Sequence, residues 1–279
     1  GVEILLVDDD NDDPDNRPAY GSALDELGAL YDVWNTLGTD DEPSATELAE
    51  YTTVLWFTGD LFGGTAGPGA ASEGALATWL DAGGCLFVSS QNYAWDRGVT
   101  SFMQDYLGVS SLTHDVFQTS VEGAGSLFDG LGPFALSYPP SLFNMSDEID
   151  PDGTAEVAFT GDKGNAAVDK ETSSYRTAFL GFPLEAVPSV TDRADVLAGF
   201  VDGCVGCGAS DNLTVTDRFV DSTATVEACS SVTLGSGVHV DASGDLTVRA
   251  GDRVVLENGV SIGAGGKLTV ETGSVSPAN

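Results

Sequence analysis

The chain has 279 residues, 42% of them hydrophobic, which is enough for one large core or two modest ones. Ten basic residues against 44 acidic ones give a formal net charge of −34, which excludes nucleic acid and anionic membrane surfaces as partners. No run of about 18 apolar residues occurs, so we expect no membrane insertion. A surface rich in Asp and poor in Lys is typical of saline or Ca²⁺-rich extracellular surroundings.

From residue 1 to about 203, short apolar runs alternate with amphipathic stretches. The runs EILLV, TVLWF and CLFVS each precede a helix-like segment. The clearest of these segments is SEGALATWLDAGG at 72–84, where we expect Ser72 to cap a helix and Gly83 and Gly84 to end it. Strands that alternate with helices predict an α/β domain whose mostly parallel sheet is covered by helices on both faces.

Later segments of this first part predict strands without helices between them, and therefore an antiparallel extension at one edge of the sheet. The segment SVTDRADVLAGFVDGC at 189–204 predicts a closing helix with Ser189 or Thr191 as its N-cap. The four expected strands of the extension lie within 115–122, 155–162, 165–172 and 175–183.

The last part of the chain consists of short β runs separated by Gly, Asp and Ser. SVTLGSGVHVDASGDLTV at 231–248 and RVVLENGVSIGAGGKLTV at 253–270 superimpose without a gap, with six apolar positions in register. Three β runs per repeat predict the coils of a short β-solenoid, each of which buries its inward row against its neighbours. We therefore expect an α/β domain at 1–203, a Cys-containing hinge at 204–210 and an all-β solenoid domain at 211–279.

The four cysteines form an even set in a chain that otherwise has the features of a secreted protein, so we expect disulfides. Cys204 and Cys207 form a C-x-x-C pair, but no second pair and no neighbouring His completes a zinc ligand set. Three connectivities are possible. We favour Cys85 with Cys204 and Cys207 with Cys229, because this pattern would staple each domain separately.

The order of motifs LLVDDD, LYDVWNT, TVLWFTGD, LDAGGCLFVSSQN, FMQDYLGV and AFLGFPLEAV resembles a flavodoxin-like domain related to class I glutamine amidotransferases. Domains of this kind are appended to secreted bacterial proteins, and the resemblance covers about the first 200 residues. The later motifs EACSSVTLGSGVHV and LTVRAGDRVVLENGVSI resemble a short β-solenoid of the three-coathanger-stack type. Both resemblances imply an extracellular or cell-surface location.

The resemblance to amidotransferases implies a Cys nucleophile on a turn directly after a strand, activated by a His. Here CLFVSS ends in Ser89 and Ser90 without a Cys at the turn, and Glu185 in GFPLEAV has no partner His. The chain has two His, of which His239 falls in the solenoid and His114 beyond the turn. The loss of nucleophile and base predicts a protein that is not an enzyme. The alternative is a hydrolase that uses Ser90 with His114.

Acidic residues follow several of the expected strands, and parallel strands end at one edge of a sheet, where open α/β folds bind ligands. Hard oxygen ligands in this number suit Ca²⁺, although Pro14 and Tyr20 stand where an EF-hand loop has Gly and a closing Glu. The alternative is a solvated loop in which Asp8 or Asp9 caps a turn. We expect no other cofactor. The predicted Ca²⁺ ligands are Asp8, Asp9, Asp10 and Asp60, with Asn92 and Asp96 on the same edge.

Tyr93 and Trp95 in QNYAWDRG are either core residues or a platform on which a sugar ring stacks. Taken together, these features predict a secreted, non-catalytic structural or adhesion protein whose partner is a second copy, another extracellular protein or a glycan. A head-to-tail contact between the solenoid of one copy and the α/β domain of the next would make a filament or surface layer. The alternatives are a hydrolase that uses Ser90 or a metal at the acidic edge, and a Ca²⁺-dependent carbohydrate-binding module.

Overall fold

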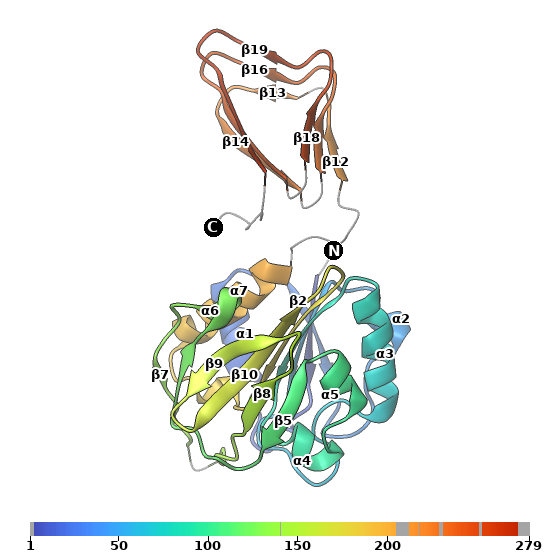
Figure 1. Cartoon of the computed structure of the whole chain (residues 1–279), viewed down its shortest axis with the longest axis vertical. Coiled ribbons are helices and arrows are strands. Elements are labelled where there is room, and N and C mark those ends of the chain that lie inside the picture. The colour runs from blue at the N-terminus through green and yellow to red at the C-terminus, as the bar shows by residue number, and fades with distance from the viewer. Residues whose placement is uncertain are drawn as a thin grey trace. The chain divides into compact units, whose positions relative to one another are not determined.

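The computed structural model describes residues 3–139, 141–204, 212–216, 218–228, 231–250 and 253–272. The chain divides into an N-terminal unit, Gly1–Cys204, and a C-terminal unit, Val205–Asn279 (Figure 1). Of the predicted hinge at 204–210, only Cys204 belongs to the described residues. No helix in the described ranges combines the length and the apolar character that a bilayer span requires.

A mixed sheet of nine strands forms the centre of the N-terminal unit. Its strands are β1 (Ile4–Asp8), β2 (Tyr31–Asn35), β3 (Thr53–Phe57), β4 (Cys85–Ser89), β6 (Ser120–Gly123), β7 (Phe134–Ala135), β9 (Glu156–Gly161), β10 (Gly164–Glu171) and β11 (Arg176–Leu180). They lie in the order β2-β1-β3-β4-β11-β10-β9-β6-β7. The pairings from β2 to β11 are parallel, and those from β11 to β7 are antiparallel.

The helices pack on the sheet through apolar residues at helical spacing. They are α1 (Arg17–Glu26), α2 (Ala45–Leu48), α3 (Ala70–Asp81), α4 (Tyr93–Arg97), α5 (Ser101–Asp105), α6 (Gly125–Phe128), η1 (Leu184–Ala186) and α7 (Val190–Cys204). In α3, Leu76, Trp79 and Leu80 are buried as predicted, but the helix starts after Gly69, so Ser72 lies inside it rather than at its cap. Ser189 Oγ accepts a hydrogen bond from Asp192 N at 3.2 Å, which confirms Ser189 as the cap of α7.

Alternate residues of β1, β3 and β4 supply two hydrophobic clusters, because successive side chains of a strand point to opposite faces of the sheet. Leu6 and Leu55 belong to one cluster, together with α1 and α7. Leu5 and Val54 belong to the other, together with α3 and α5. All three strands are buried along their whole length, which explains their continuous apolar sequences.

The prediction of a flavodoxin-like, mostly parallel sheet with helices on both faces is wrong. Four of the eight strand pairings are antiparallel, so the expected extension is half of the sheet. Beside β10, a two-stranded antiparallel sheet of β5 (Val109–Thr113) and β8 (Glu148–Pro151), rather than a helix, packs on the large sheet (Figure 1). Its Ile149 joins the same cluster as Val168 and Phe179. The short link between β9 and β10 permits only antiparallel pairing.

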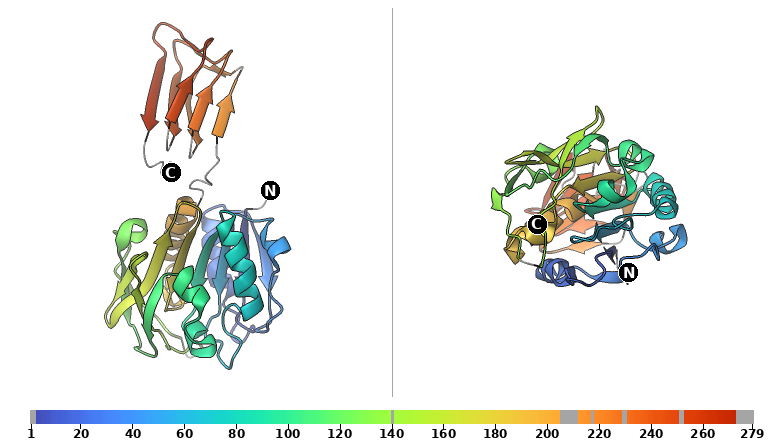
Figure 2. Two further views of the ribbon diagram at one scale, coloured as in Figure 1. Left: turned by 45° about the vertical axis from the view of Figure 1, so that its right-hand side comes forward. Right: turned by 90° about the horizontal axis from the view of Figure 1, so that it is seen from below.

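The C-terminal unit is all-β, as predicted, and contains three parallel sheets of three strands each. The first sheet is β12 (Asn212–Val215), β15 (Ser231–Leu234) and β18 (Arg253–Leu256). The second is β13 (Phe219–Val220), β16 (His239–Val240) and β19 (Ser261–Ile262). The third is β14 (Thr223–Ala228), β17 (Asp245–Ala250) and β20 (Lys267–Thr272), and corresponding strands of successive coils lie side by side (Figure 2).

The register of these sheets confirms the repeat that the sequence predicts. Val232 pairs with Val254 and Leu246 pairs with Leu268, as the sequence superposition requires. Equivalent positions of successive coils therefore stack directly on one another, and the inward side chains of the middle coil are shielded on both sides. The fully or almost fully buried residues of this row are Val232, Leu234, Val238, Val240, Leu246 and Val248.

Candidate functional site

The parallel strands β1, β3, β4 and β11 end at the same edge of the sheet, which we call the carboxyl edge. Side chains join the loops that follow these strands. Thr58 Oγ1 donates a hydrogen bond to Ser90 Oγ at 2.7 Å, and Leu184 N donates one to Ser89 Oγ at 2.9 Å. The loops after β3, β4 and β11 therefore meet, as the sequence predicts for this edge.

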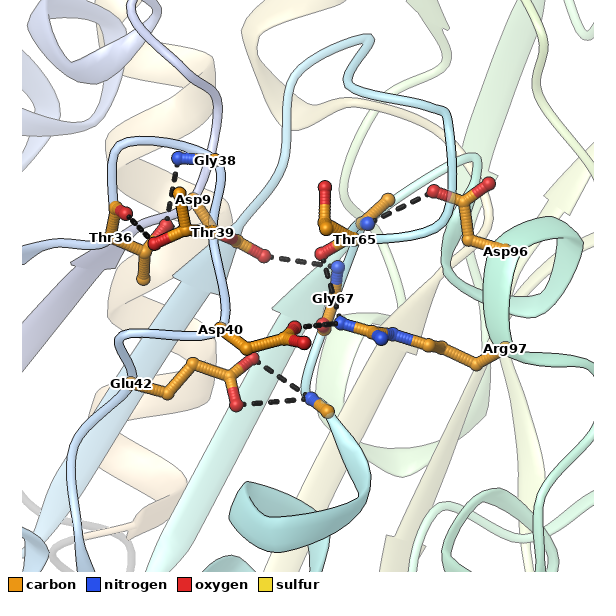
Figure 3. Close-up of polar contacts among 12 residues, drawn as sticks. Asp9, Thr36, Gly38, Thr39, Asp40, Glu42, Thr65, Gly67, Asp96 and Arg97 are labelled. Atoms are coloured by element: carbon orange, nitrogen blue, oxygen red, sulfur yellow. Dashed lines mark hydrogen bonds and ion pairs between the residues drawn. The ribbon is translucent and has the colours of Figure 1, made fainter.

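Asp9 is buried at the carboxyl edge, where three donors surround its carboxylate. Its Oδ1 accepts a hydrogen bond from Thr36 Oγ1 at 2.6 Å, and its Oδ2 accepts one from Gly67 N at 3.0 Å (Figure 3). The same Oδ2 also accepts one from Trp56 Nε1 at 3.1 Å. Burial raises the pKa of Asp9 to about 8, while these hydrogen bonds oppose the rise. The contacts connect β3 with the loops after β2 and β3, so Asp9 serves the fold and faces protein donors rather than a cation.

The glycine-rich loop at 58–69 is fastened at its backbone by further acidic side chains. Asp96 accepts hydrogen bonds from Gly63 N at 3.1 Å and from Ala66 N at 3.0 Å. Glycine-rich loops can bind phosphate through their N–H groups, but here the N–H groups of Gly63, Ala66, Gly67 and Gly69 already donate to carboxylates. These four groups are therefore not free for a phosphate, and Asp96, expected near the calcium ligands, is a structural residue of this loop.

Glu42 and Arg97 hold the far end of the same loop. Glu42 accepts hydrogen bonds from Gly69 N at 2.8 and 3.1 Å, and burial raises the pKa of its carboxyl to about 7. Arg97 Nη2 donates to the carbonyl oxygens of Thr65 and Gly67, both at 3.1 Å, and lies 2.6 Å from Asp40 Oδ1 (Figure 3). No local sequence pattern indicated these contacts, because their partners are distant in the chain.

Asp10 and Asp60, two of the predicted calcium ligands, also have backbone donors. Asp10 Oδ1 accepts from Asp12 N at 2.8 Å and its Oδ2 accepts from Asn16 N at 2.6 Å, which closes the loop after β1. Asp60 Oδ2 accepts from Phe143 N at 3.2 Å. Burial raises the pKa of Asp60, and the nearby charge of Asp10 raises it further. The two carboxylates are neighbours, and each is oriented by the loop that it caps.

Glu185 adds a further acid to this edge. Tyr20 OH donates a hydrogen bond to Glu185 Oε2 at 2.6 Å, whereas Glu185 Oε1 is buried without a hydrogen-bond partner among the described residues. Burial raises the pKa of Glu185 to about 7. The sequence places no His near Glu185, and no local pattern indicates Tyr20 as its partner, because 165 residues separate the two.

A different set of carboxylates gathers at the end of β1. Asp8, Asp12 and Asp15 each offer one oxygen, and these oxygens lie within 4.8 Å of one another. Of the four predicted ligands, the structure therefore brings only Asp8 into this group. Asp12 and Asp15 were missed, although they belong to the same acidic run. Which acids of such a run converge depends on how the loop folds back, and no spacing rule for a linear motif describes that path.

The Ser90 hydroxyl is buried and occupied as an acceptor. In addition to Thr58, Tyr93 N donates to Ser90 Oγ, at 3.0 Å. His114 lies elsewhere: its Nδ1 is 3.5 Å from Asp147 Oδ2 and its ring meets the Trp95 ring edge-on at 5.3 Å. No hydrogen bond joins Ser90 to His114 within the described chain. The geometry gives this serine no base.

Tyr93 and Trp95, the two residues predicted to stack on a sugar ring, differ in their exposure to solvent. Tyr93 is 0% exposed and its OH donates to Glu73 Oε1 at 2.6 Å, so its ring is part of the core. Trp95 is 60% exposed and lies on the surface of α4. The two side chains therefore do not form one stacking platform.

Cys85 and Cys204 adjoin at the opposite end of the sheet. Cys85 Sγ lies 3.7 Å from the carbonyl oxygen of Cys204, and both residues are free cysteines. The predicted disulfide between them is therefore not formed in this structure, although the fold places the two predicted partners next to each other. The other predicted pair, Cys207 and Cys229, lies outside the described residues.

A separate cavity of about 340 Å³ opens on the antiparallel half of the sheet, lined by Glu156, Asp169 and Glu171 among others. Asp169 is 2% exposed and its Oδ1 has no hydrogen-bond partner among the described residues. Burial raises its pKa to about 7; the charges of Glu156 and Glu171 raise it further, and Arg176 opposes them. A carboxyl group in this setting is most stable when it is protonated.

We expect Asp169→Asn to stabilise the protein at pH 8 by about 2 kcal/mol and to have little effect below pH 4. The folded pKa lies above the unfolded one, so the contribution of Asp169 is fully present below about pH 4 and is lost as the pH rises through about 7. Chemical denaturation from pH 4 to 9 measures the difference. Asp129→Asn, at an exposed carboxylate, is the control, and an equal pH profile for both variants would contradict the assignment.

Comparisons with known proteins bear on the fold alone. No family model and no curated protein matches the chain. Among solved structures, Cytoplasmic Protein STM3548 from Salmonella typhimurium is similar at a TM-score of 0.52 and 11% identity, over 71% of this chain and 96% of that chain. Exo-beta-1,4-mannosidase Op5Man5 from Opitutaceae bacterium strain TAV5 matches at a TM-score of 0.49 and 12% identity, over 70% of this chain and 35% of that chain. The resemblances to amidotransferases and to three-coathanger stacks stay predictions.

Proposed function

We propose that the protein is a non-catalytic structural module of the extracellular space or cell surface that self-associates through the open end of its C-terminal coils. The observation that carries this proposal is an exposed inward row on the coil formed by β18, β19 and β20. Leu256, Ile262 and Val270 are 52%, 47% and 45% exposed. Their counterparts one coil earlier, completely buried, are Leu234, Val240 and Val248.

The chemistry of this open end favours a second copy as the partner. Within the described chain, β18, β19 and β20 each have a neighbouring strand on one side only, so three strand edges stand open together. A partner that pairs with all three edges must present three strands in the same arrangement. The coils of this chain do so, because each coil stacks on the next with its apolar row in register.

Two features of the N-terminal unit support the non-catalytic part of the proposal. The turn after β4 carries no Cys, and the Ser90 hydroxyl there is occupied by neighbouring donors and has no base. The extracellular location rests on the acidic composition and on the even number of cysteines. No observation in the described residues favours the hydrolase or the Ca²⁺-dependent carbohydrate-binding module over this proposal.

We expect the purified chain to associate in a concentration-dependent manner, and more strongly as salt screens its charge of −34. Sedimentation velocity and electron microscopy measure the assembly and tell a closed dimer from an open filament. The double variant Leu256→Arg with Ile262→Arg should be monomeric, because it places charge in the apolar contact.

Val255→Arg is the matched control, since Val255 lies on the same strand and points to the opposite face. It should assemble like the unmodified chain. A chain that stays monomeric across concentration and salt would contradict the proposal. Equal loss of assembly in the double variant and the control would also contradict it, because the contact would then not involve the inward row. Continued assembly of the double variant would contradict it as well, because the contact would then lie on the N-terminal unit.

A further inference from the structure

We propose that Asp8, Asp12 and Asp15 bind a calcium ion at the carboxyl end of β1. This site is independent of the proposed self-association, which concerns the other unit of the chain. One carboxylate oxygen from each residue lies within 4.8 Å of the others. Because Ca–O distances are about 2.3–2.6 Å, oxygens on opposite sides of one calcium ion are about 5 Å apart. The three oxygens therefore stand at distances that one shared ion accommodates.

The state of Asp8 is a second and independent observation. Its side chain is 0% exposed, and neither carboxylate oxygen has a hydrogen-bond partner among the described residues. Asp9, the next residue, accepts three hydrogen bonds from protein donors. A buried, ionised carboxylate without donors is costly unless a cation approaches it or it takes up a proton. The fold satisfies Asp9 by itself, whereas Asp8 has only acids nearby, Asp10, Asp12 and Asp15, apart from Arg17, and a bound cation would relieve their repulsion.

Arg17 is the resident counter-charge of this group. Its Nη1 lies 3.6 Å from Asp8 Oδ2 and its Nη2 lies 3.8 Å from Asp15 Oδ2, both beyond hydrogen-bonding distance. The Arg17 side chain is 41% exposed, so the guanidinium can move into solvent without unfolding α1. The single positive charge of Arg17 thus lies near two carboxylates, Asp8 and Asp15, without a hydrogen bond to either, whereas a divalent ion would bind both directly. Arg17 and calcium therefore compete for the same oxygens.

The ligand types select calcium among the common metals. The group contains carboxylates and no His or Cys, which disfavours zinc and other soft or borderline ions. Asn35 Nδ2 holds Asp12 at 3.1 and 3.4 Å from its two oxygens, so this exposed ligand is partly oriented. Magnesium requires a near-ideal octahedron at about 2.1 Å, whereas calcium accepts irregular loop ligands with water in the remaining positions.

Calorimetric titration of the full chain with calcium chloride, after removal of divalent ions by chelation, tests the site. We expect one saturable site in 0.15 M NaCl that persists in 1 M NaCl, where diffuse attraction to the acidic surface is screened. Asp12→Asn and Asp15→Asn should each weaken binding about tenfold or more, because the number of charged ligands sets the affinity. Asp13→Asn, which removes the same charge from the same loop, should change the affinity less than about twofold.

Arg17→Gln gives the sharpest outcome, because it removes the competing cation and should tighten calcium binding several-fold. If calcium were held only by the general negative charge of the surface, Arg17→Gln would also tighten binding. Asp13→Asn and Asp12→Asn would then lower the calcium affinity equally, and that result would overturn the site. Absence of saturable binding, or magnesium binding as tight as calcium binding, would also overturn it. Circular dichroism of each variant verifies folding, and a calcium-dependent rise in Tm that Asp15→Asn abolishes provides a second readout.

Discussion

Replacing Asp9 by alanine is expected to lower the free energy of unfolding of the N-terminal unit by about 4 kcal/mol. The change leaves three buried donors, Thr36 Oγ1, Trp56 Nε1 and Gly67 N, without an acceptor. Each unsatisfied buried group costs about 1–3 kcal/mol. The alanine variant no longer carries the desolvation cost of the Asp9 carboxyl group, which offsets part of this loss. Denaturant unfolding monitored by tryptophan fluorescence measures the loss, since Trp56 is one of the three partners.

Two comparisons separate this structural role from a ligand-binding role. Asp9→Asn retains one acceptor oxygen and should cost about half as much. In Asp9→Ala, hydrogen exchange should accelerate at Gly67 N more than at Gly63 N, which Asp96 holds independently. A loss below about 0.5 kcal/mol would contradict the role assigned to Asp9 and would return its carboxylate to the set of available calcium ligands.

A disulfide between Cys85 and Cys204 is expected to stabilise the oxidised protein by about 4–5 kcal/mol relative to its reduced form. The two residues adjoin in the structure but are 119 positions apart in the chain, and the entropy that a cross-link removes from the unfolded chain grows with the length of its loop. Burial raises the pKa of the Cys204 thiol, so its reactive thiolate is scarce and we expect oxidation of the folded protein to be slow.

Alkylation of the unfolded, unreduced protein followed by peptide mass spectrometry identifies the pairing. Unfolding of one preparation with and without reductant measures the stabilisation and avoids the cost of a buried substitution. The double variant Cys207→Ser with Cys229→Ser is the control and should retain the whole effect, because neither residue belongs to the N-terminal unit. Free, alkylated Cys85 and Cys204 in oxidised protein, or a cross-link from either residue to Cys207 or Cys229, would contradict this pairing.

The sequence predicted best what depends on neighbours along the chain. The apolar runs that became β1, β3 and β4 form strands because they are buried on both faces. The repeat in the last part of the chain predicted the pairing of Val232 with Val254, since repeated coils stack equivalent positions on one another. Strand direction was harder, because an apolar strand pairs either way. The hydrophobic periodicity of a segment does not specify how the chain connects it to the next strand. It therefore predicted neither the balance between parallel and antiparallel pairing nor the β5–β8 sheet beside β10.

By itself, the sequence determined the strands of the parallel half of the sheet, the main helices, the coil repeat and the strand end at which the acidic side chains gather. Only the tertiary structure decided what each acid does. Asp8 and Asp9 are adjacent and chemically identical, yet Asp9 meets donors 27, 47 and 58 residues away, whereas both oxygens of Asp8 lack a donor among the described residues. The reason is physical: burial and hydrogen-bond partners set the energy of a carboxylate, and distant segments supply both.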